Sequence, residues 1–184
     1  MSRTNADEID KIKMTITPKR ERYLRSIHRR LREAAKTAFG PEHGRFDFYG
    51  YLELVIKTYW SWKDKNARTK YGRQFGALFG IPPRKGRSSL HYLIGATSHG
   101  EEPMHSAAAK KIETRDNRWV QGLRFVAKKR SAVEKQGLEA FCNSQGGIAG
   151  CERKSKGKPS KKRSNRPSKI VKIRRGTLVA GSTK

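Results

Sequence analysis

The sequence has few cysteines, few acidic residues and no long apolar run, and each shortage excludes a class of protein. Its 184 residues include only two cysteines, which are too few for a disulfide framework and indicate a reducing compartment. No run of about eighteen apolar residues is present, so we expect no membrane-spanning helix. The first residues are polar and lack an apolar stretch, so we expect no secretory signal. These absences predict a cytoplasmic, nucleoid-associated protein, or a nuclear one if the source is eukaryotic.

The shortage of acidic residues leaves a large excess of positive charge. Forty-three Lys and Arg stand against sixteen Asp and Glu, which gives a formal net charge of +27. A charge of this size exceeds what solubility requires and attracts polyanions through solution. Nucleic acid is the commonest polyanionic partner, and an anionic membrane surface is the alternative. The composition therefore predicts a nucleic-acid-binding protein.

Apolar residues are also scarce, and their distribution predicts three regions. They make up 34% of the chain, below the usual share of about 45–50%. We expect a flexible lead-in over residues 1–16, one helical domain over residues 17–151, and a disordered basic arm over residues 152–184. The arm carries thirteen Lys and Arg and one Glu, a net charge of +12, and no apolar residue before Ile170. Such a segment stays disordered when free and binds nucleic acid without reading its sequence. Within it, the basic run Lys161, Lys162 and Arg163 is a candidate contact.

Aromatic residues concentrate in residues 46–79. This segment holds ten of the chain's sixteen aromatic residues, which are three Trp, six Tyr and seven Phe. Helical spacing places one apolar stripe at Phe48, Tyr51, Leu52, Val55, Tyr59 and Trp62, and a second at Ala67, Tyr71, Phe75, Leu78 and Phe79. A polar break over residues 63–66 separates the stripes, and Pro82 ends the second helix. The pattern predicts an αα-hairpin whose aromatic side chains form the core. Alternatively, Tyr49 or Trp60, which lie off the stripe, offer a ring on which a base stacks.

Further stripes complete a predicted all-α fold, a small bundle of five to six helices. The first helix begins at Thr17-Pro18, buries Leu24, Ile27, Leu31 and Ala35, and ends at Gly40-Pro41. A short helix begins at Ser88 or Ser89, one or two helices span 104–130, and a last helix spans 132–143. Gly146-Gly147 is expected to end that helix. The glycine-rich segment 146–151 resembles a sequence motif, but we assign no function to it.

One flank of the first predicted helix carries a row of five cations. They are Arg22, Arg25, Arg29, Arg32 and Lys36, at steps of three and four residues. No acidic residue is expected on the same face, and like charges at this spacing destabilise a helix. The row therefore favours a function, in which it follows phosphates along a groove edge. The alternative is an ordinary solvated face.

A second candidate is the basic loop after Pro83. Arg84, Lys85, Arg87 and Ser88 precede the start of a helix, where free N–H groups bind anions. This combination predicts a phosphate site. Residues 68–97 also allow a helix-turn-helix, although the turn is longer than the usual three or four residues.

No motif for metal binding or catalysis stands out. Eight residues separate Cys142 from Cys151, which is too many for the close cysteine pair typical of zinc sites, and no histidine lies nearby, so the sequence argues against a zinc site. Asp47, Glu53 and Asp64 would have to converge to form a two-metal nuclease, and their spacing does not require it. The five histidines are scattered, and no Walker loop or dinucleotide fingerprint is present. We therefore predict no metal, no cofactor and no enzymatic activity.

The function predicted from sequence is nucleic-acid binding, with DNA favoured over RNA. The setting would be a regulatory or accessory factor that holds DNA within a larger assembly. One alternative is a structural subunit of a ribonucleoprotein, and another is a DNA-processing enzyme.

Overall fold

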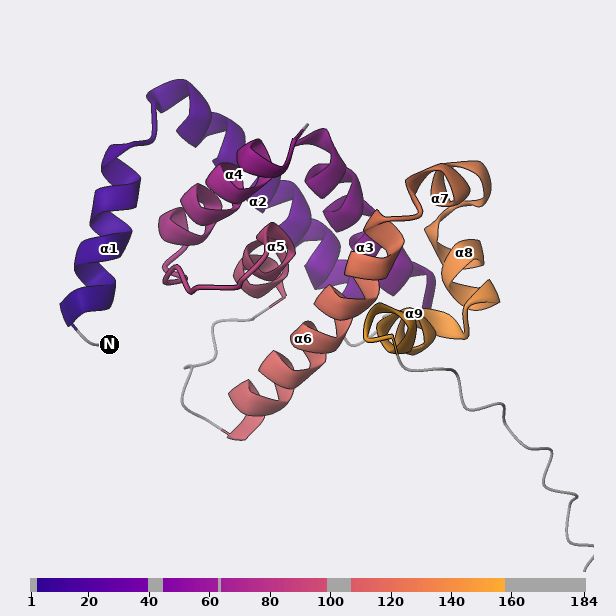
Figure 1. Cartoon of the computed structure of the whole chain (residues 1–184). Helices are drawn as coiled ribbons and strands as arrows, with labels where there is room; N and C mark the ends of the chain where they lie inside the picture. Colours follow the sequence, from indigo (N-terminus) through magenta and orange to yellow (C-terminus); the bar gives the residue numbers. More distant parts are fainter. Residues whose placement is uncertain (1–2, 40–44, 63, 99–106, 158–184) are drawn as a thin grey trace, which may run out of the picture.

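The computed structural model describes residues 3–39, 45–62, 64–98 and 107–157. This part of the chain is entirely helical and contains nine helices (Figure 1). They are α1 (Arg3–Met14), α2 (Pro18–Phe39), α3 (Arg45–Ser61), α4 (Lys65–Leu78), α5 (Ser89–Thr97), α6 (Ala107–Ala127), α7 (Arg130–Gln136), α8 (Leu138–Ser144) and α9 (Gly147–Ser155). The predicted all-α fold is confirmed, but the expected five to six helices were too few. None of the helices in the described ranges is long and apolar enough to cross a membrane.

The additional helices lie where the sequence pattern is short or is interrupted by glycine. The predicted lead-in contains α1, which packs against α4 and buries Ile9. Gly137 adopts a φ of 82° and divides the predicted last helix into α7 and α8. Gly146, with a φ of 86°, does not end the helical region, because α9 begins immediately after it. Helix α9 also crosses the predicted start of the arm at residue 152, and Cys151 within it is fully buried.

The aromatic segment forms the core, but its two helices do not pair mainly with each other. Helix α3 packs chiefly against α2, and α4 packs chiefly against α5. The predicted αα-hairpin is therefore replaced by a different pairing, because the apolar faces of α3 and α4 are covered by other helices. The stripes are confirmed in part. Tyr51, Leu52, Val55, Trp62 and Phe75 are all at most 1% exposed, whereas the other stripe residues are only partly buried: Phe48, Tyr59, Ala67, Tyr71, Leu78 and Phe79. Tyr49 and Trp60 are buried as well, so neither offers a free ring for a base.

Helix α5 is the centre of the described fold (Figure 1). It contacts α2, α3, α4 and α6. Two thirds of its nine residues are buried: Ser89, Leu90, Tyr92, Leu93, Ile94 and Thr97. A recognition helix must expose its side chains to a groove of the DNA, whereas most side chains of α5 are buried in the core. The possible helix-turn-helix over residues 68–97 is therefore wrong, because α5 cannot act as its recognition helix.

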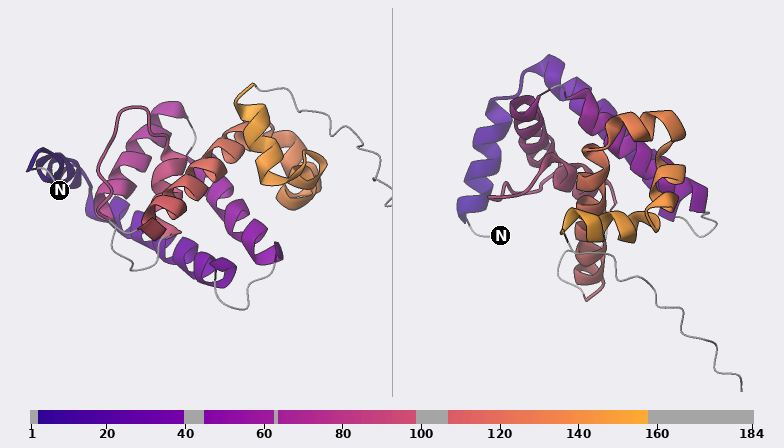
Figure 2. Two further views of the ribbon diagram at one scale, coloured as in Figure 1. Left: turned by 90° about the horizontal axis from the view of Figure 1, so that it is seen from below. Right: turned by 45° about the vertical axis from the view of Figure 1, so that its right-hand side comes forward.

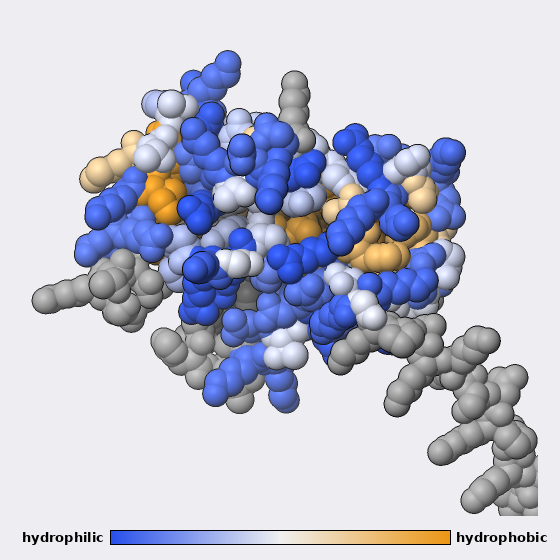
Figure 3. Space-filling view, viewed as in Figure 1, coloured by the Kyte–Doolittle hydropathy of each residue, from blue (hydrophilic) through white to orange (hydrophobic). Residues whose placement is uncertain are grey.

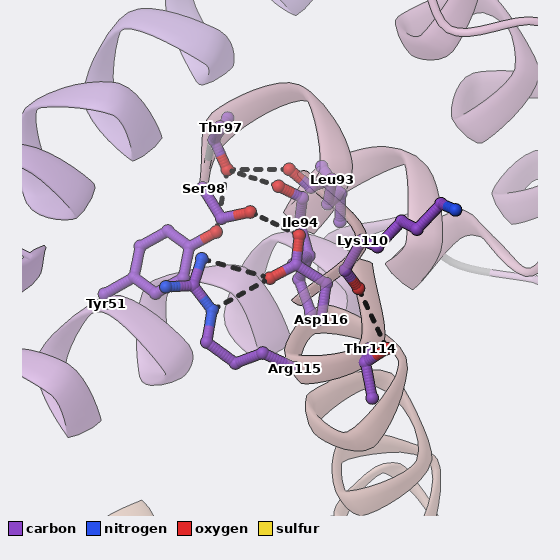
Figure 4. A network of polar contacts seen from close by, with 9 residues as sticks. All are labelled: Tyr51, Leu93, Ile94, Thr97, Ser98, Lys110, Thr114, Arg115 and Asp116. Carbon is purple, nitrogen blue, oxygen red and sulfur yellow. Dashed lines mark hydrogen bonds and ion pairs between the residues drawn. The ribbon is translucent and has the colours of Figure 1, made fainter. Parts of the chain in front are cut away.

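Buried polar groups join α5 to α3 and α6 (Figure 4). The Thr97 hydroxyl donates to the Leu93 carbonyl at 2.7 Å, so the Tyr51 hydroxyl, 2.8 Å from Thr97 Oγ1, is the donor of the second bond. The Ser98 hydroxyl donates to the buried Asp116 carboxylate at 2.6 Å. Arg115 Nη2 lies 3.3 Å from the other Asp116 oxygen. These bonds satisfy groups that would destabilise the core if they were left without partners.

Helix α9 crosses α6 at close range (Figure 2). The approach is centred on Gly122, where an added Cβ would lie 2.6 Å from Ile148 Cδ1 and 3.0 Å from the Ile148 carbonyl oxygen. Glycine is required here because a side chain would push the two helices apart. The crossing leaves a concave surface along each half of α6, and both hollows are lined by basic residues.

Candidate nucleic-acid interface

Hydrophilic side chains cover most of the described surface on the side shown in Figure 3. The first predicted site, which we call the α2 row, comprises Arg22, Arg25, Arg29, Arg32 and Lys36. Four of these side chains are exposed and Arg32 is half-buried. The predicted buried stripe of this helix, Leu24, Ile27, Leu31 and Ala35, is confirmed.

One expectation about the α2 row is wrong. Glu21 lies within reach of the row, and its carboxylate is 2.7 Å from Arg25 Nη2 at i,i+4 spacing. This ion pair offsets part of the like-charge repulsion that we expected to destabilise the helix. Among the described residues, neither Arg22 nor Arg29 has a carboxylate partner. Lys36 is exposed and likewise has no carboxylate partner in the described part of the chain, so it and these two arginines are the cations of the row most available to an anion.

The basic loop lies between α4 and α5 and packs on the start of α6. The Arg84 backbone N–H donates to the Tyr92 hydroxyl at 3.2 Å, which anchors the loop to α5. The Arg84 and Lys85 side chains are exposed. Arg87 is half-buried and lies 3.6 Å from the Glu113 carboxylate. Burial is the main cause that lowers the pKa of Arg87, and the positive charge of Arg84 lowers it further. Two of the three loop cations therefore point to solvent, and the third joins the loop to α6.

Ser88 caps α5 together with His91. The Ser88 N–H donates to His91 Nδ1 at 3.1 Å, and the Ser88 hydroxyl lies 3.0 Å from the same nitrogen. Because Nδ1 accepts a hydrogen bond, the proton of the neutral ring belongs on Nε2. Burial, together with the positive charges of Arg124 and Arg87, lowers the pKa of His91 to about 4. Positive charge therefore accumulates near the start of α5.

The sequence did not reveal one of the two hollows along α6, which we call the basic pocket. It has a volume of about 470 Å³ and opens between α3, α4, α5, α6 and α9. Its lining residues are Tyr59, Arg68, Ser88, Leu90, Gln121, Arg124, Ala127, Lys128 and Ser155. Three of them are cations, and none of the lining residues is Asp or Glu. The pocket therefore concentrates positive charge on a concave surface.

The cations of the basic pocket are held by different elements. Arg68 of α4 donates from Nε to the Trp62 carbonyl at 2.8 Å and lies 4.7 Å from the centre of the Tyr59 ring. Arg124 lies in the last turn of α6, and Lys128 comes just after the end of that helix at Ala127. Neither has a carboxylate within salt-bridge distance in the described part of the chain. An anion in the pocket would thus meet cations from α4 and α6 together.

The other hollow along α6 is also basic, but its charge is partly compensated. It has a volume of about 490 Å³ and is lined by Lys110, Lys111, Thr114, Arg115, Arg118, Trp119, Ile148, Ala149 and Glu152. The Glu152 carboxylate lies 3.7 Å from Arg118 and 2.6 Å from Lys156. Arg115 lies against Asp116 and over the Trp119 ring. This hollow is therefore a weaker anion site than the basic pocket.

The predicted arm begins beside the basic pocket. Ser155 lines the pocket, and Gly157 is the last described residue. The predicted contacts Lys161, Lys162 and Arg163 lie outside the described residues. Among the predicted site residues in the described part of the chain, only Ser88 lines the basic pocket. Arg87 precedes it in the sequence but is not a lining residue. No residue of the α2 row lines either hollow.

A polar stripe on α6 was the signal that sequence reasoning missed. Its members follow helical spacing, and each lines one of the two hollows: Lys110, Thr114, Gln121 and Arg124 on α6, and Lys128 just beyond its end. The contribution of Arg68 had no such signal, because its place beside α6 depends on how distant helices pack.

Protonation of His91 should destabilise the fold at acid pH. Its folded pKa of about 4 lies below the ordinary value of 6.5, so between these values the unfolded chain binds more protons. The stabilising contribution is therefore complete above pH 6.5 and decreases as the pH falls toward 4. We expect a loss of about 1–2 kcal/mol at this partly exposed ring. Urea unfolding at pH 4 to 7 should show a shallower pH dependence for His91→Gln, whose amide keeps a cap acceptor. Equal pH dependence in both proteins would contradict the assignment.

The described residues contain no group of three or more His, Cys, Asp and Glu side chains placed to hold a metal ion. The candidate carboxylates have other partners: Asp64 accepts from the Ala67 N–H at 2.7 Å, and Glu53 pairs with Lys57 at 2.6 Å. Cys142 and Cys151 are buried free thiols whose sulfur atoms lie 3.9 Å apart.

Comparison with protein-family models, curated proteins and solved structures found no match for this chain.

Proposed function

We propose that this protein binds nucleic acid, with duplex DNA favoured over RNA, as a regulatory or accessory factor. The binding surface comprises the basic pocket, the loop over residues 84–88, the α2 row and the arm. The observation that carries the proposal is the basic pocket, where Arg68, Arg124 and Lys128 converge without a lining carboxylate. The net charge of +27 supports it, because long-range attraction to a polyanion follows from such a charge.

The convergence of cations argues against a purely solvated surface. Arg124 in the last turn of α6 and Lys128 just beyond its end line the same pocket, so their like charges repel each other. Arg124 also adds to the positive potential that lowers the pKa of His91. A bound phosphate would offset this repulsion and accept hydrogen bonds from the same groups. The arrangement is thus suited to an anionic partner.

The regular spacing of the cations in the α2 row favours a duplex over folded RNA as the partner. From Arg22 to Lys36 the row extends for about 21 Å along α2, at 1.5 Å per residue. A regular duplex presents phosphates along a continuous edge that such a row can follow. Folded RNA, the partner in the ribonucleoprotein alternative, offers single-stranded loops and irregular shapes.

The test is a titration of one labelled duplex at several salt concentrations. We expect Arg124→Gln with Lys128→Gln to weaken binding about tenfold and to reduce the slope of log K against log salt by about 1.8. The matched control is Lys13→Gln with Lys57→Gln, which removes two exposed cations that pair with Asp10 and Glu53. The control should change the slope by less than about half a unit.

The same titration with an RNA of identical sequence distinguishes the alternatives. Tighter binding to RNA would replace the DNA proposal by the ribonucleoprotein one. Equal slopes for the pocket variant and the control would remove the basic pocket from the interface. Metal-dependent turnover of either substrate would favour the DNA-processing enzyme.

The α2 row is tested separately by Arg22→Gln with Arg29→Gln. Both side chains are exposed and lie two turns apart on one flank of α2. We expect binding to weaken by a similar factor on all duplex sequences and the salt slope to fall by about 1.8, because phosphate contacts carry no sequence information. Circular dichroism should be unchanged. An unaltered slope would show that α2 faces away from the nucleic acid.

A further inference from the structure

We infer that the basic pocket binds a phosphate monoester, presented by the end of a nucleic-acid strand or by a free mononucleotide. This inference rests on the proposed function, because it assigns the pocket to one chemical group of that partner. The two sources share the same chemistry, a phosphate with a single ester bond beside a sugar.

The size of the pocket favours a terminal group over a continuous backbone. Its volume of about 470 Å³ equals that of a cube with edges of about 8 Å and lies within the usual range for small-molecule sites. The major groove of a duplex alone is about 12 Å wide, so the body of a duplex stays outside this space and only its phosphates can reach the cations. A strand end or a free nucleotide can place its phosphate inside.

The charge of the pocket also matches a monoester better than a diester. A phosphate monoester carries a charge of about −1.5 to −2 at neutral pH, whereas a phosphodiester carries about −1. Three cations line the pocket, and no Asp or Glu is among its lining residues. Ser88 and Leu90 bring the start of α5 to the pocket wall, where the helix dipole adds to the attraction. A dianion therefore gains more here than a monoanion.

One cation is held in place before any ligand arrives. The hydrogen bond from Arg68 Nε to the Trp62 carbonyl and the packing of its guanidinium on the Tyr59 ring fix its direction. A side chain that is already ordered loses less entropy on binding. Tyr59 also lines the pocket, which gives the sugar of a nucleotide an apolar surface beside the cations.

The experiment compares two duplexes of one sequence that differ only in a 5′-phosphate, at constant salt, with the full-length chain. We expect the phosphorylated duplex to bind about tenfold more tightly, and Arg124→Gln with Lys128→Gln to reduce this ratio to about one. Lys110→Gln with Arg118→Gln is the matched control, because it removes two cations of α6 from the other hollow and should keep the ratio. Circular dichroism of each variant confirms that it folds.

A second arm identifies the source of the phosphate. Deoxyadenosine 5′-monophosphate is titrated against the protein, with deoxyadenosine as the uncharged comparison. Binding of the monophosphate that depends on Arg124 and Lys128, without a preference for the phosphorylated duplex, assigns the pocket to a free nucleotide. A ratio of about one together with no such monophosphate binding overturns the inference, while duplex binding itself would leave the proposed function intact. Absence of binding to either duplex would instead overturn the proposed function.

Discussion

Replacing Phe75 by Ala is expected to lower the free energy of unfolding by about 3–5 kcal/mol, the range for removal of a buried aromatic ring. The Phe75 side chain is completely buried on α4. Its ring centre lies 5.0 Å from that of Phe79 and 6.0 Å from that of His28 on α2. The substitution would therefore leave a cavity between α2 and α4 that the neighbouring rings cannot fill without moving. Urea unfolding followed by circular dichroism measures the change.

Tyr23→Ala is the matched control for this measurement. Tyr23 is an aromatic residue of α2, but it is 44% exposed. Its replacement should change the free energy of unfolding by less than about 1 kcal/mol, as for most surface substitutions. If Phe75→Ala cost no more than the control, the aromatic cluster would not be the element that stabilises the fold.

Removal of residues 158–184 is expected to weaken nucleic-acid binding by about a hundredfold or more and to leave the fold intact. The removed segment contains ten Lys and Arg and no acidic residue. Each lost phosphate contact reduces the slope of log K against log salt by about 0.9, so the loss of five contacts would reduce it by about 4.5. The helical circular dichroism and the melting temperature should stay near those of the full chain. A salt titration of one labelled duplex provides the binding measurement.

The position of the cut matters because α9 continues beyond the predicted domain boundary. A chain that ends at Cys151 would lose the second half of α9, including Ser155 at the basic pocket. We therefore expect that shorter chain to melt at a lower temperature than the one that ends at Gly157. Unfolding of the chain that ends at Gly157 would show that the arm supports the fold. An unchanged salt slope would show that the arm makes no contact with phosphates.

Local periodicity in the sequence predicted many of the buried residues, although Tyr49 and Trp60 are buried off the stripe. Leu24, Tyr51, Phe75 and Leu93 all lie on stripes with a helical repeat, and all are buried. The reason is that a residue's place on a helix depends only on its spacing from its neighbours. The same rule missed α1 and α9, and it joined α7 and α8 into one predicted helix because it did not locate the break at Gly137. The excess of positive charge was likewise a property of the sequence alone.

Tertiary structure decided which helix covers each buried stripe and which cations meet. An apolar stripe specifies that it must be covered but does not specify its partner, so α3 and α4 pack on α2 and α5 although they are adjacent in the chain. Arg68 is more than fifty residues from Arg124, and no sequence spacing relates them. They line one pocket because α4 packs on α5, α5 packs on α6, and Gly122 allows α9 to cross α6 closely.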